Sequence, residues 1–252
     1  MLKFFYAGSI RIPSYGMMII VGVIVCNLIA QQSLRKNLKQ YKEFMLIEIV
    51  GGIGAVICAK LMTILNSPSN DLLSVGSFMD AGYSYYGGLF GFFSFAYLIC
   101  KVFRIDGTVY AKEYIYLLPL LHTFWKVGCY LGGCCYGRLY NGALAICYPD
   151  GVNDVAGKMF FPSPLFEAIV AGVITIILFY VKRRKSPLNP VGIYLVLYGL
   201  TRFVLEFCRY HEYQSFFSVA HVYSIIATGS GIVLVIISNR KSGYERARTE
   251  NN

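Results

Sequence analysis

A chain of 252 residues that is 56% hydrophobic and only 14% charged is too apolar for a soluble domain. The composition therefore indicates an integral membrane protein and excludes a soluble enzyme or a nucleic-acid binder. The net charge of +10 fits this class, because the basic residues gather in a few short connections, as is typical of cytoplasmic loops.

Seven apolar segments are each about long enough to cross a bilayer core as a helix. Helices are expected because lipid offers no hydrogen-bond partners to an open backbone. The segments cover residues 15–31, 44–65, 84–103, 113–131, 164–181, 190–208 and 219–238. We expect an all-α integral membrane protein with about seven transmembrane helices, built as a single transmembrane domain over residues 1–252.

The connections predict the orientation of these helices. Lys and Arg residues occur in every second connection and in the C-terminal tail, at residues 35–42, 101–112, 182–185 and 240–248, whereas residues 66–83 have none. The positive-inside rule therefore places the N-terminus outside and the C-terminus in the cytoplasm, with a tail at residues 239–252. The same rule places the long, glycine-rich loop region around residues 132–163 on the outer, extracytoplasmic side, where its length suits a functional lid or arm.

The N-terminal stretch MLKFFYAGSIRIPSYG has no long apolar core before Pro13. It does not resemble a signal peptide, so we expect the first helix to stay attached.

The sixth apolar segment carries charged residues in a position where they are costly. Arg202 and Glu206 lie four residues apart and share one helix face. An Arg at mid-membrane costs about 2.5–3.5 kcal/mol on insertion scales, so such groups usually face a polar cavity. A guanidinium can donate two parallel hydrogen bonds to phosphate oxygens. Arg209 is expected one turn beyond Glu206 on the same face, so Arg202 and Arg209 together indicate a phospholipid head-group site. The alternative is an Arg–Glu pair that only locks two helices together.

The fourth segment carries His122 and Lys126, which are also four residues apart on one face. The sequence continues as the glycine-rich stretch 128–138. We expect this stretch to break the helix at its outer end and to expose backbone N–H groups as an anion-binding nest.

Paired glycines at Gly87 and Gly88 open the third segment after several tyrosines, among them Tyr86. The tyrosines suit an interfacial aromatic belt. The two glycines would let a lipid or a neighbouring backbone approach closely.

Other polar groups have simpler alternatives. Lys60 either faces the interior or snorkels to an interface. Glu167 follows Ser163 at nearly the spacing of a capping box, which favours a helix start, although it could also pair with an arginine. His211 and His221 are expected on the outer side, where His221 is the better candidate for a functional role.

The cysteines at positions 129, 134, 135 and 147 do not fit the usual zinc spacings, so no metal site is expected. A structural role is expected instead, as thiols or as a disulfide from Cys134 or Cys135 to Cys147, with a catalytic thiol as the alternative. Cys26, Cys58, Cys100 and Cys208 are expected to act as small hydrophobic residues.

These motifs together resemble the prolipoprotein diacylglyceryl transferase family over nearly the whole chain. The resemblance is carried by IRIPSYGMMIIVG, YYGGLFGF, KVGCYLGGCCYGR, FPSPLFEA, GIYLVLYGLTRFVLEFCR and FSVAHVYS. The family's essential arginine and the glutamate four residues later fall on Arg202 and Glu206. Its second arginine falls on Arg209, and its first-helix tyrosine falls on Tyr15.

The chain departs from the family pattern at several positions. Lys126, in the run WKVG, replaces the arginine of the family's GRIG box, so the charge is kept but the bidentate fork is lost. Four further family residues differ in this chain. The family's asparagine is Cys129, its glutamate is Cys134, its histidine is Tyr86 and its second-helix arginine is Lys60. The run FPSPLFE lacks the histidine and glutamine of its box, and the GCCYG form resembles a divergent branch.

The resemblance implies transfer of a diacylglyceryl group from phosphatidylglycerol to a cysteine thiol of a prolipoprotein, or to a related thiol or hydroxyl acceptor at the outer membrane face. Glycerol phosphate would be released, and the enzyme would lie in the bacterial plasma (inner) membrane. The alternative is a phospholipid-binding or lipid-transport protein that retains the fold without the chemistry. No cofactor or metal is expected, because cationic side chains supply the positive charge.

The resemblance also implies roles for individual residues. Arg202, with Lys126 and Arg209, would bind the head group and stabilise the leaving phosphate, while Glu206 orients Arg202. The residues expected to bind or admit the head group also include Tyr15, Tyr86, Gly87, Gly88 and Gly128. The base that deprotonates the acceptor thiol stays open between Tyr86, His122 and His221.

Overall fold

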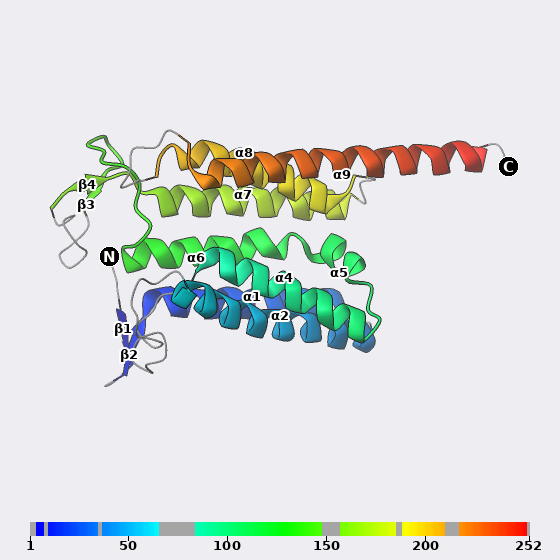
Figure 1. Cartoon of the computed structure of the whole chain (residues 1–252), viewed down its shortest axis with the longest axis horizontal. Helices are drawn as coiled ribbons and strands as arrows, with labels where there is room; N and C mark the ends of the chain where they lie inside the picture. The colour runs from blue at the N-terminus through cyan, green and yellow to red at the C-terminus, as the bar shows by residue number, and fades with distance from the viewer. Residues whose placement is uncertain are drawn as a thin grey trace. The chain divides into compact units, whose positions relative to one another are not determined.

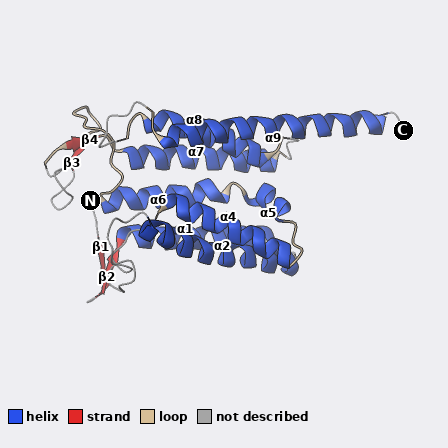
Figure 2. Ribbon diagram, viewed as in Figure 1, coloured by secondary structure: helices blue, strands red, loops and turns tan. Residues whose placement is uncertain are grey.

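The computed structural model describes residues 4–7, 10–34, 37–65, 84–147, 157–184, 188–209 and 217–250. It is mainly helical (Figure 2). Contacts divide the chain into two compact units, one formed by Met1–Ala30 with Ala111–Asn252 and the other by Gln31–Tyr110.

Each of the expected apolar segments contains a helix (Figure 1). The helices are α1 (Ser14–Leu34), α2 (Leu38–Leu65), α4 (Tyr85–Val102), α5 (Gly107–Tyr114), α6 (Leu117–Gly132), α7 (Ser163–Arg183), α8 (Pro190–Glu206) and α9 (Val219–Glu250). Within the described residues, four helical stretches are long and apolar enough to cross a membrane, namely α1, α2, α7 and residues Val219–Arg240 of α9. The expectation of a mostly helical, multi-pass membrane protein is therefore confirmed.

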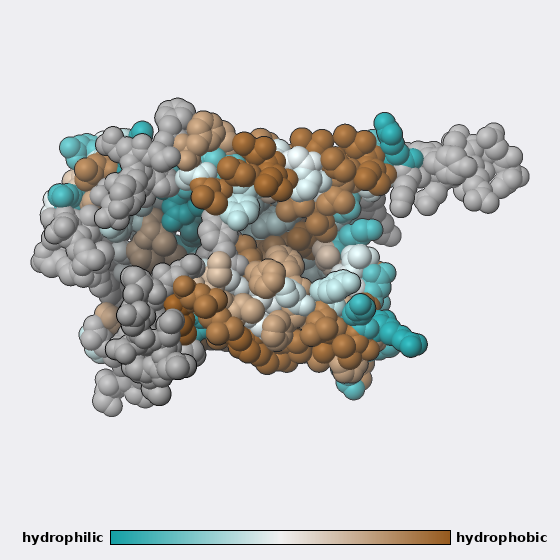
Figure 3. Space-filling model, in the orientation of Figure 1, coloured by the Kyte–Doolittle hydropathy of each residue, from teal (hydrophilic) through white to brown (hydrophobic). Residues whose placement is uncertain are grey.

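The exposed surfaces of these helices are apolar. Figure 3 shows hydrophobic residues over much of the visible helical surface. Ile176, Val204 and Ile226 are among the large apolar side chains that are exposed. Such surfaces suit contact with lipid tails rather than with water.

Two short pairs of strands accompany the helices. Strands β1 (Phe4–Ala7) and β2 (Ile10–Pro13) form one antiparallel pair, and β3 (Ile146–Cys147) and β4 (Met159–Phe160) form another. The second pair lies within the long connection around residues 132–163. It is anchored by Phe160, whose buried ring packs against Tyr136 and Ile146. Aromatic and β-branched residues in both pairs favour strands.

The expected single helix over residues 113–131 is divided into α5 and α6, with a turn at Ile115 and Tyr116. Pro119 explains the break, because it has no N–H to donate to the Ile115 carbonyl and its ring clashes there in a continuous helix. The Leu118 N–H instead donates to the Ile115 carbonyl at 3.1 Å, which tightens the turn. Proline therefore fixes where α6 begins.

In the unit formed by Gln31–Tyr110, α4 packs against α2. A Cβ atom added at Gly87 would lie 2.6 Å from the Cys58 carbonyl oxygen, so Gly87 permits close helix contact. Of the two alternatives for this glycine, the structure shows approach of a neighbouring backbone. Lys60 is only 5% exposed, so its side chain does not snorkel to an interface.

In the other unit, α6 packs against α7, α7 against α8, and α8 against α9. The polar residues expected within these helices are Lys126 on α6, Glu167 on α7, Arg202 and Glu206 on α8, and His221 on α9. The packing therefore brings the charged segments of four helices into one part of the fold.

Candidate active site

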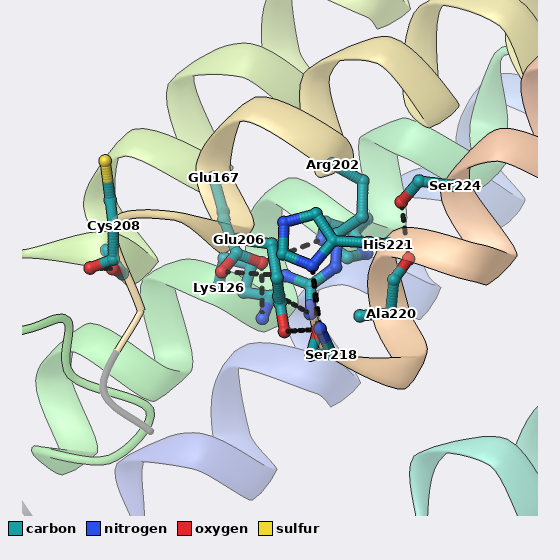
Figure 4. Close-up of polar contacts among 11 residues, drawn as sticks. Lys126, Glu167, Arg202, Glu206, Cys208, Ser218, Ala220, His221 and Ser224 are labelled. Atoms are coloured by element: carbon teal, nitrogen blue, oxygen red, sulfur yellow. Dashed lines mark hydrogen bonds and ion pairs between the residues drawn. The ribbon is translucent and has the colours of Figure 1, made fainter. Parts of the chain in front are cut away.

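Glu167 on α7 lies at the centre of the charged cluster (Figure 4). Its Oε2 lies 2.7 Å from Lys126 Nζ and 3.9 Å from His122 Nε2. Its Oε1 lies 3.4 Å from Arg202 Nη1. Cations from α6 and α8 thus converge on one carboxylate that is only 5% exposed.

Helix α7 begins at Ser163, four residues before Glu167, as the sequence favoured, but not through a capping box. Pro162 is the N-cap residue of α7, and no side chain caps this helix end. The Ser163 hydroxyl donates instead to the Cys208 carbonyl at 3.2 Å. The alternative, in which Glu167 pairs with an arginine, is confirmed.

Arg202 joins two carboxylates. Its Nη1 faces Glu167, and its Nη2 lies 2.7 Å from Oε2 of Glu206, one turn further along α8. Arg202 and Glu206 therefore share one helix face, as their spacing predicts. The Ser218 hydroxyl donates to Oε1 of Glu206 at 2.8 Å, so this carboxylate is held from both sides.

His221 is fixed by its neighbours more tightly than a free base would be. Its Nδ1 accepts a hydrogen bond from the Ser218 backbone N–H at 3.0 Å. The ring is 2% exposed and packs among Phe203, Phe207 and Phe217. Because Nδ1 accepts a hydrogen bond, the proton of the neutral ring lies on Nε2. In this tautomer Nε2 is a donor and does not accept a proton.

A small cavity of about 20 Å³ lies between α6, α7 and α8 at the charged cluster. This volume is enough for a water molecule. The cavity is lined by Pro119, His122, Glu167, Val170, Ala171, Ile174, Tyr194, Tyr198, Thr201, Arg202 and Leu205. Its charged members are Glu167 from α7 and Arg202 from α8, and its remaining walls are mostly apolar, so the charged cluster borders an apolar slot.

Tyr15 on α1 lies beside the same stretch of α6. Its ring meets Trp125 edge-on, with the ring centroids 6.1 Å apart, and Trp125 directly precedes Lys126. A Cβ atom at Gly128 would lie 3.2 Å from the Tyr15 Cα, so this glycine permits the close contact of α6 with α1. Gly128 thus has a packing role that explains why no side chain is present there.

The glycine-rich stretch 128–138 ends helix α6, as expected. Helix α6 continues to Gly132 and ends at Gly133, which adopts the left-handed conformation with φ 73°. The Gly133 and Cys134 N–H groups donate to the Tyr130 and Cys129 carbonyls. These N–H groups are used in capping the helix, so they do not form the expected anion-binding nest.

Arg209 lies beyond the end of the helix that carries Arg202 and Glu206. Helix α8 ends at Glu206, and Arg209 instead forms a β-bridge with Gly137. The chain leaves the helix in a turn in which the Arg209 N–H donates to the Glu206 carbonyl at 3.1 Å. The expected one-turn spacing is therefore wrong for Arg209.

A short segment that follows α6 ties three helix ends together. The Gly137 N–H donates to the Phe161 carbonyl at 2.8 Å, and the Arg138 N–H donates to the Cys208 carbonyl at 2.9 Å. A Cβ atom at Gly137 would lie only 2.5 Å from the Cys208 carbonyl oxygen. This close approach connects the end of α6 with the start of α7 and the end of α8, the helices that carry Lys126, Glu167 and Arg202.

The cysteines that follow this part of α6 form a cluster of thiols. The sulfur atoms of Cys129, Cys134 and Cys135 all lie within 4.8 Å of one another. No disulfide joins either Cys134 or Cys135 to Cys147, so the structure shows the thiol alternative. Hydrogen bonds with the other two thiols of the cluster, and then the positive charges of Lys126 and Arg209, lower the pKa of Cys135.

Some candidates are not tested by these contacts. The side chain of Tyr86 and all of Tyr83 and His211 lie outside the described residues. Gly88 lies in the other compact unit, as Gly87 does. The expected roles of Tyr86, Gly87 and Gly88 at the lipid head group stay predictions.

Sequence reasoning did not assign Glu167 or Ser218 to the site. The signal for Glu167 was a carboxylate inside an apolar segment, but its nearness to Ser163 favoured a helix start. The signal for Ser218 was its place three residues before His221, at the start of α9. Neither spacing identifies the partner, because the partners lie on other helices.

Comparisons with known proteins identify the family. The sequence profile described as prolipoprotein diacylglyceryl transferase matches residues 3–237. Phosphatidylglycerol–prolipoprotein diacylglyceryl transferase 2 of Clostridium perfringens is 25% identical over 94% of this chain and 95% of that protein. The corresponding enzyme of Clostridium tetani is 24% identical over 80% and 82%. That of Chlorobaculum tepidum is 30% identical over 64% of this chain, a match that spans 57% of the relative's length. The chain belongs to the prolipoprotein diacylglyceryl transferase family.

Proposed function

We propose that this chain transfers a diacylglyceryl group from phosphatidylglycerol to a cysteine thiol of a prolipoprotein and releases glycerol phosphate. The names of the curated relatives state these substrates for those proteins. The family match over residues 3–237 favours a transferase over a phospholipid binder or transporter that retains only the fold.

One observation carries this proposal. Lys126 on α6 and Arg202 on α8 meet at a single buried carboxylate, beside a slot with mostly apolar walls. Two cations placed in this way suit a phosphodiester head group, since they can hold its charged oxygens while the lipid tails lie against apolar residues. Glu167 keeps the two cations paired and in place until the lipid enters.

The chemistry needs a cationic environment for the leaving group. The acceptor thiolate forms a C–S bond to the terminal glyceryl carbon, and the bond from this carbon to the phosphate oxygen breaks. The electron pair of that bond leaves with glycerol phosphate, where the charges of Arg202 and Lys126 stabilise it. Glu206 and Ser218 hold Arg202 in the orientation that this role requires.

We assign the base for the acceptor thiol to His122. Of the histidines in the described residues, His122 lines the cavity and lies beside Glu167. His221 instead acts as a positioning residue, because its Nδ1 accepts a hydrogen bond and its ring is enclosed by phenylalanines. The ring of Tyr15 meets Trp125, the residue before Lys126, which supports a hydrogen bond from the Tyr15 hydroxyl to the head group.

The proposed membrane arrangement has seven crossings of a bacterial plasma membrane, with the N-terminus outside and the C-terminus in the cytoplasm. The alternating basic connections support this orientation. It would place the end of α6, the start of α7, the end of α8 and the start of α9 on the outer side. These are the helix ends near which Lys126, Glu167, Glu206 and His221 lie, so the site would face an acceptor at the outer surface.

A reconstitution assay tests the function. The purified chain in detergent would receive phosphatidylglycerol with a labelled diacylglyceryl group and a peptide that contains an acceptor cysteine. We expect glycerol phosphate release together with lipid on the peptide. Arg202→Lys keeps the charge but loses the fork, so we expect at least a 100-fold slower transfer. Arg183→Lys, at the other end of α7, is the control and should transfer normally.

Each outcome separates the candidates. Release of glycerol phosphate without labelled peptide would indicate another acceptor. Lipid binding without release would support the non-catalytic alternative. Normal transfer by Arg202→Lys would show that the guanidinium fork is not needed.

A further inference from the structure

The thiol cluster at the end of α6 is built by a helix-capping turn. Gly133 ends the helix in the left-handed conformation, and the Cys134 N–H returns to the Cys129 carbonyl at 3.1 Å. Cys135 also has a positive φ, of 60°. These two left-handed residues reverse the chain over the last turn of α6, and they place Cys134 and Cys135 beside Cys129.

The resulting arrangement has the dimensions of a metal site. Zinc–sulfur bonds of about 2.3 Å place the sulfur ligands of one ion roughly 4 Å apart. The three sulfur atoms lie within 4.8 Å of one another, so shifts of tenths of an ångström would bring them to that spacing. A disulfide would use two of these thiols and leave the third, whereas one ion uses all three.

We propose that Cys129, Cys134 and Cys135 together bind one soft, thiophilic metal ion, either Zn²⁺ or Cu⁺. Thiolate ligands select these ions over Mg²⁺ and Ca²⁺, which take oxygen ligands. Cu⁺ would be satisfied by three sulfurs, and Zn²⁺ would take a fourth ligand from outside the cluster. The site was not expected from the sequence because the C-x-x-x-x-C-C spacing differs from the usual zinc patterns.

Burial and charge support this site. Cys129 is 3% exposed, while Cys134 and Cys135 are half-buried, so an ion can enter from one side and be held against the helix. Lys126 lies three residues before Cys129 on α6, and Arg209 is bridged to Gly137, two residues after Cys135, so both bring positive charge to this part of the fold. The ion would fasten the end of α6 to the segment that reaches Gly137. This proposal goes beyond the transfer reaction and does not depend on it.

The test measures the thiols in the intact wild-type chain. The purified, reduced, metal-free chain in detergent would be treated with a cysteine-alkylating reagent, with and without one equivalent of Zn²⁺ or, in a second arm under anaerobic conditions, Cu⁺. Peptide mass spectrometry would follow each cysteine. We expect the metal to slow alkylation of Cys134 and Cys135 at least tenfold and to leave the exposed Cys147 unchanged. The arm with stronger protection identifies the preferred ion.

Variants test whether the three thiols act together. Bound metal per chain would be measured after dialysis for Cys129→Ser, Cys134→Ser and Cys135→Ser, with the half-buried Cys208→Ser as the matched control. We expect about one ion per chain in the wild type and the control, and at least tenfold weaker binding in each cluster variant. The proposal would be overturned if the metal slowed alkylation of Cys147 as much as that of Cys134 and Cys135. It would also be overturned if the cluster variants bound the metal as tightly as the wild type. Alkylation that neither metal slows in the wild type would also overturn it.

Discussion

Lys126 Nζ lies 2.7 Å from Glu167 Oε2, and this contact joins the last two turns of α6 to the first turns of α7. Both side chains are nearly inaccessible to solvent. Ions in such a place lose their hydration, and their mutual attraction offsets that loss only while both partners are present. The pair therefore stabilises the packing of α6 on α7 and also defines where positive charge is held in the site.

Glu167→Gln should reduce both stability and transfer. The change leaves Lys126 and Arg202 without the carboxylate that they share, so two buried cations would repel each other. Breaking one buried pair costs about 3 kcal/mol, which predicts a clearly lower thermal midpoint. Transfer should fall at least tenfold, because neither cation would stay in position.

The control for this variant is Glu113→Gln, which removes a half-exposed carboxylate that pairs with Lys182. Its midpoint and transfer rate should stay close to those of the wild type. A Glu167→Gln variant as stable as Glu113→Gln would contradict a central role for Glu167.

Lys126→Ala and Lys126→Arg should separate charge from geometry. Removing the ammonium should slow transfer about 100-fold, because one of the two cations at the leaving phosphate is lost. Arginine restores the residue type found in the family's box, so Lys126→Arg should keep at least a tenth of the activity. Lys182→Ala is the control, since this lysine lies at the other end of α7. Equal activity of Lys126→Ala and wild type would remove Lys126 from the site.

Ser218→Ala should act through Glu206 and His221. The Ser218 hydroxyl donates to Glu206 and lies 3.1 Å from Nδ1 of His221, so its loss leaves a buried carboxylate with one partner fewer. Such a loss costs about 1–3 kcal/mol, which should appear as a slower transfer of roughly tenfold or more. Ser230→Ala, which changes an exposed serine on α9, should change nothing measurable. Similar rates for both variants would show that Ser218 does not position Glu206.

Gly137→Ala should loosen the connection between the helix ends. The added methyl group would lie 2.5 Å from the Cys208 carbonyl oxygen, so the backbone must shift. Overpacking of this kind costs about 1–3 kcal/mol, and the shift would disturb α7 and α8 together. Gly229→Ala is the control, because nothing lies within 4 Å of its added Cβ. Thermal unfolding in detergent compares the two, and equal midpoints would rule out the close approach at Gly137.

Helical spacing within one segment predicted several features of the site. The four-residue interval between Arg202 and Glu206 predicted their shared face, and the measured contact confirms it. The same rule failed for Arg209, because α8 ends at Glu206 before the next turn is completed. Spacing is informative only as far as the helix continues, and the sequence did not mark that end.

The glycine-rich stretch after Lys126 shows two uses of glycine. Helix α6 passes through Gly128, which permits close contact with α1, and it ends at Gly133, within the stretch predicted to end it. Glycine both ends helices and permits close packing, and these two uses have the same sequence signature. Only the position of the neighbouring helix separates them.

The sequence by itself determined that this chain is a helical membrane protein, which segments are helical and which charged residues lie inside them. These properties follow from local hydrophobicity and from the spacing of residues along one helix. The tertiary structure decided that Glu167 receives Lys126 and Arg202, that Ser218 holds Glu206, and that three cysteines share one turn. The first is a contact between three helices, the second joins the residue before α9 to α8, and the third depends on two left-handed residues, so none of the three is encoded by spacing along one helix.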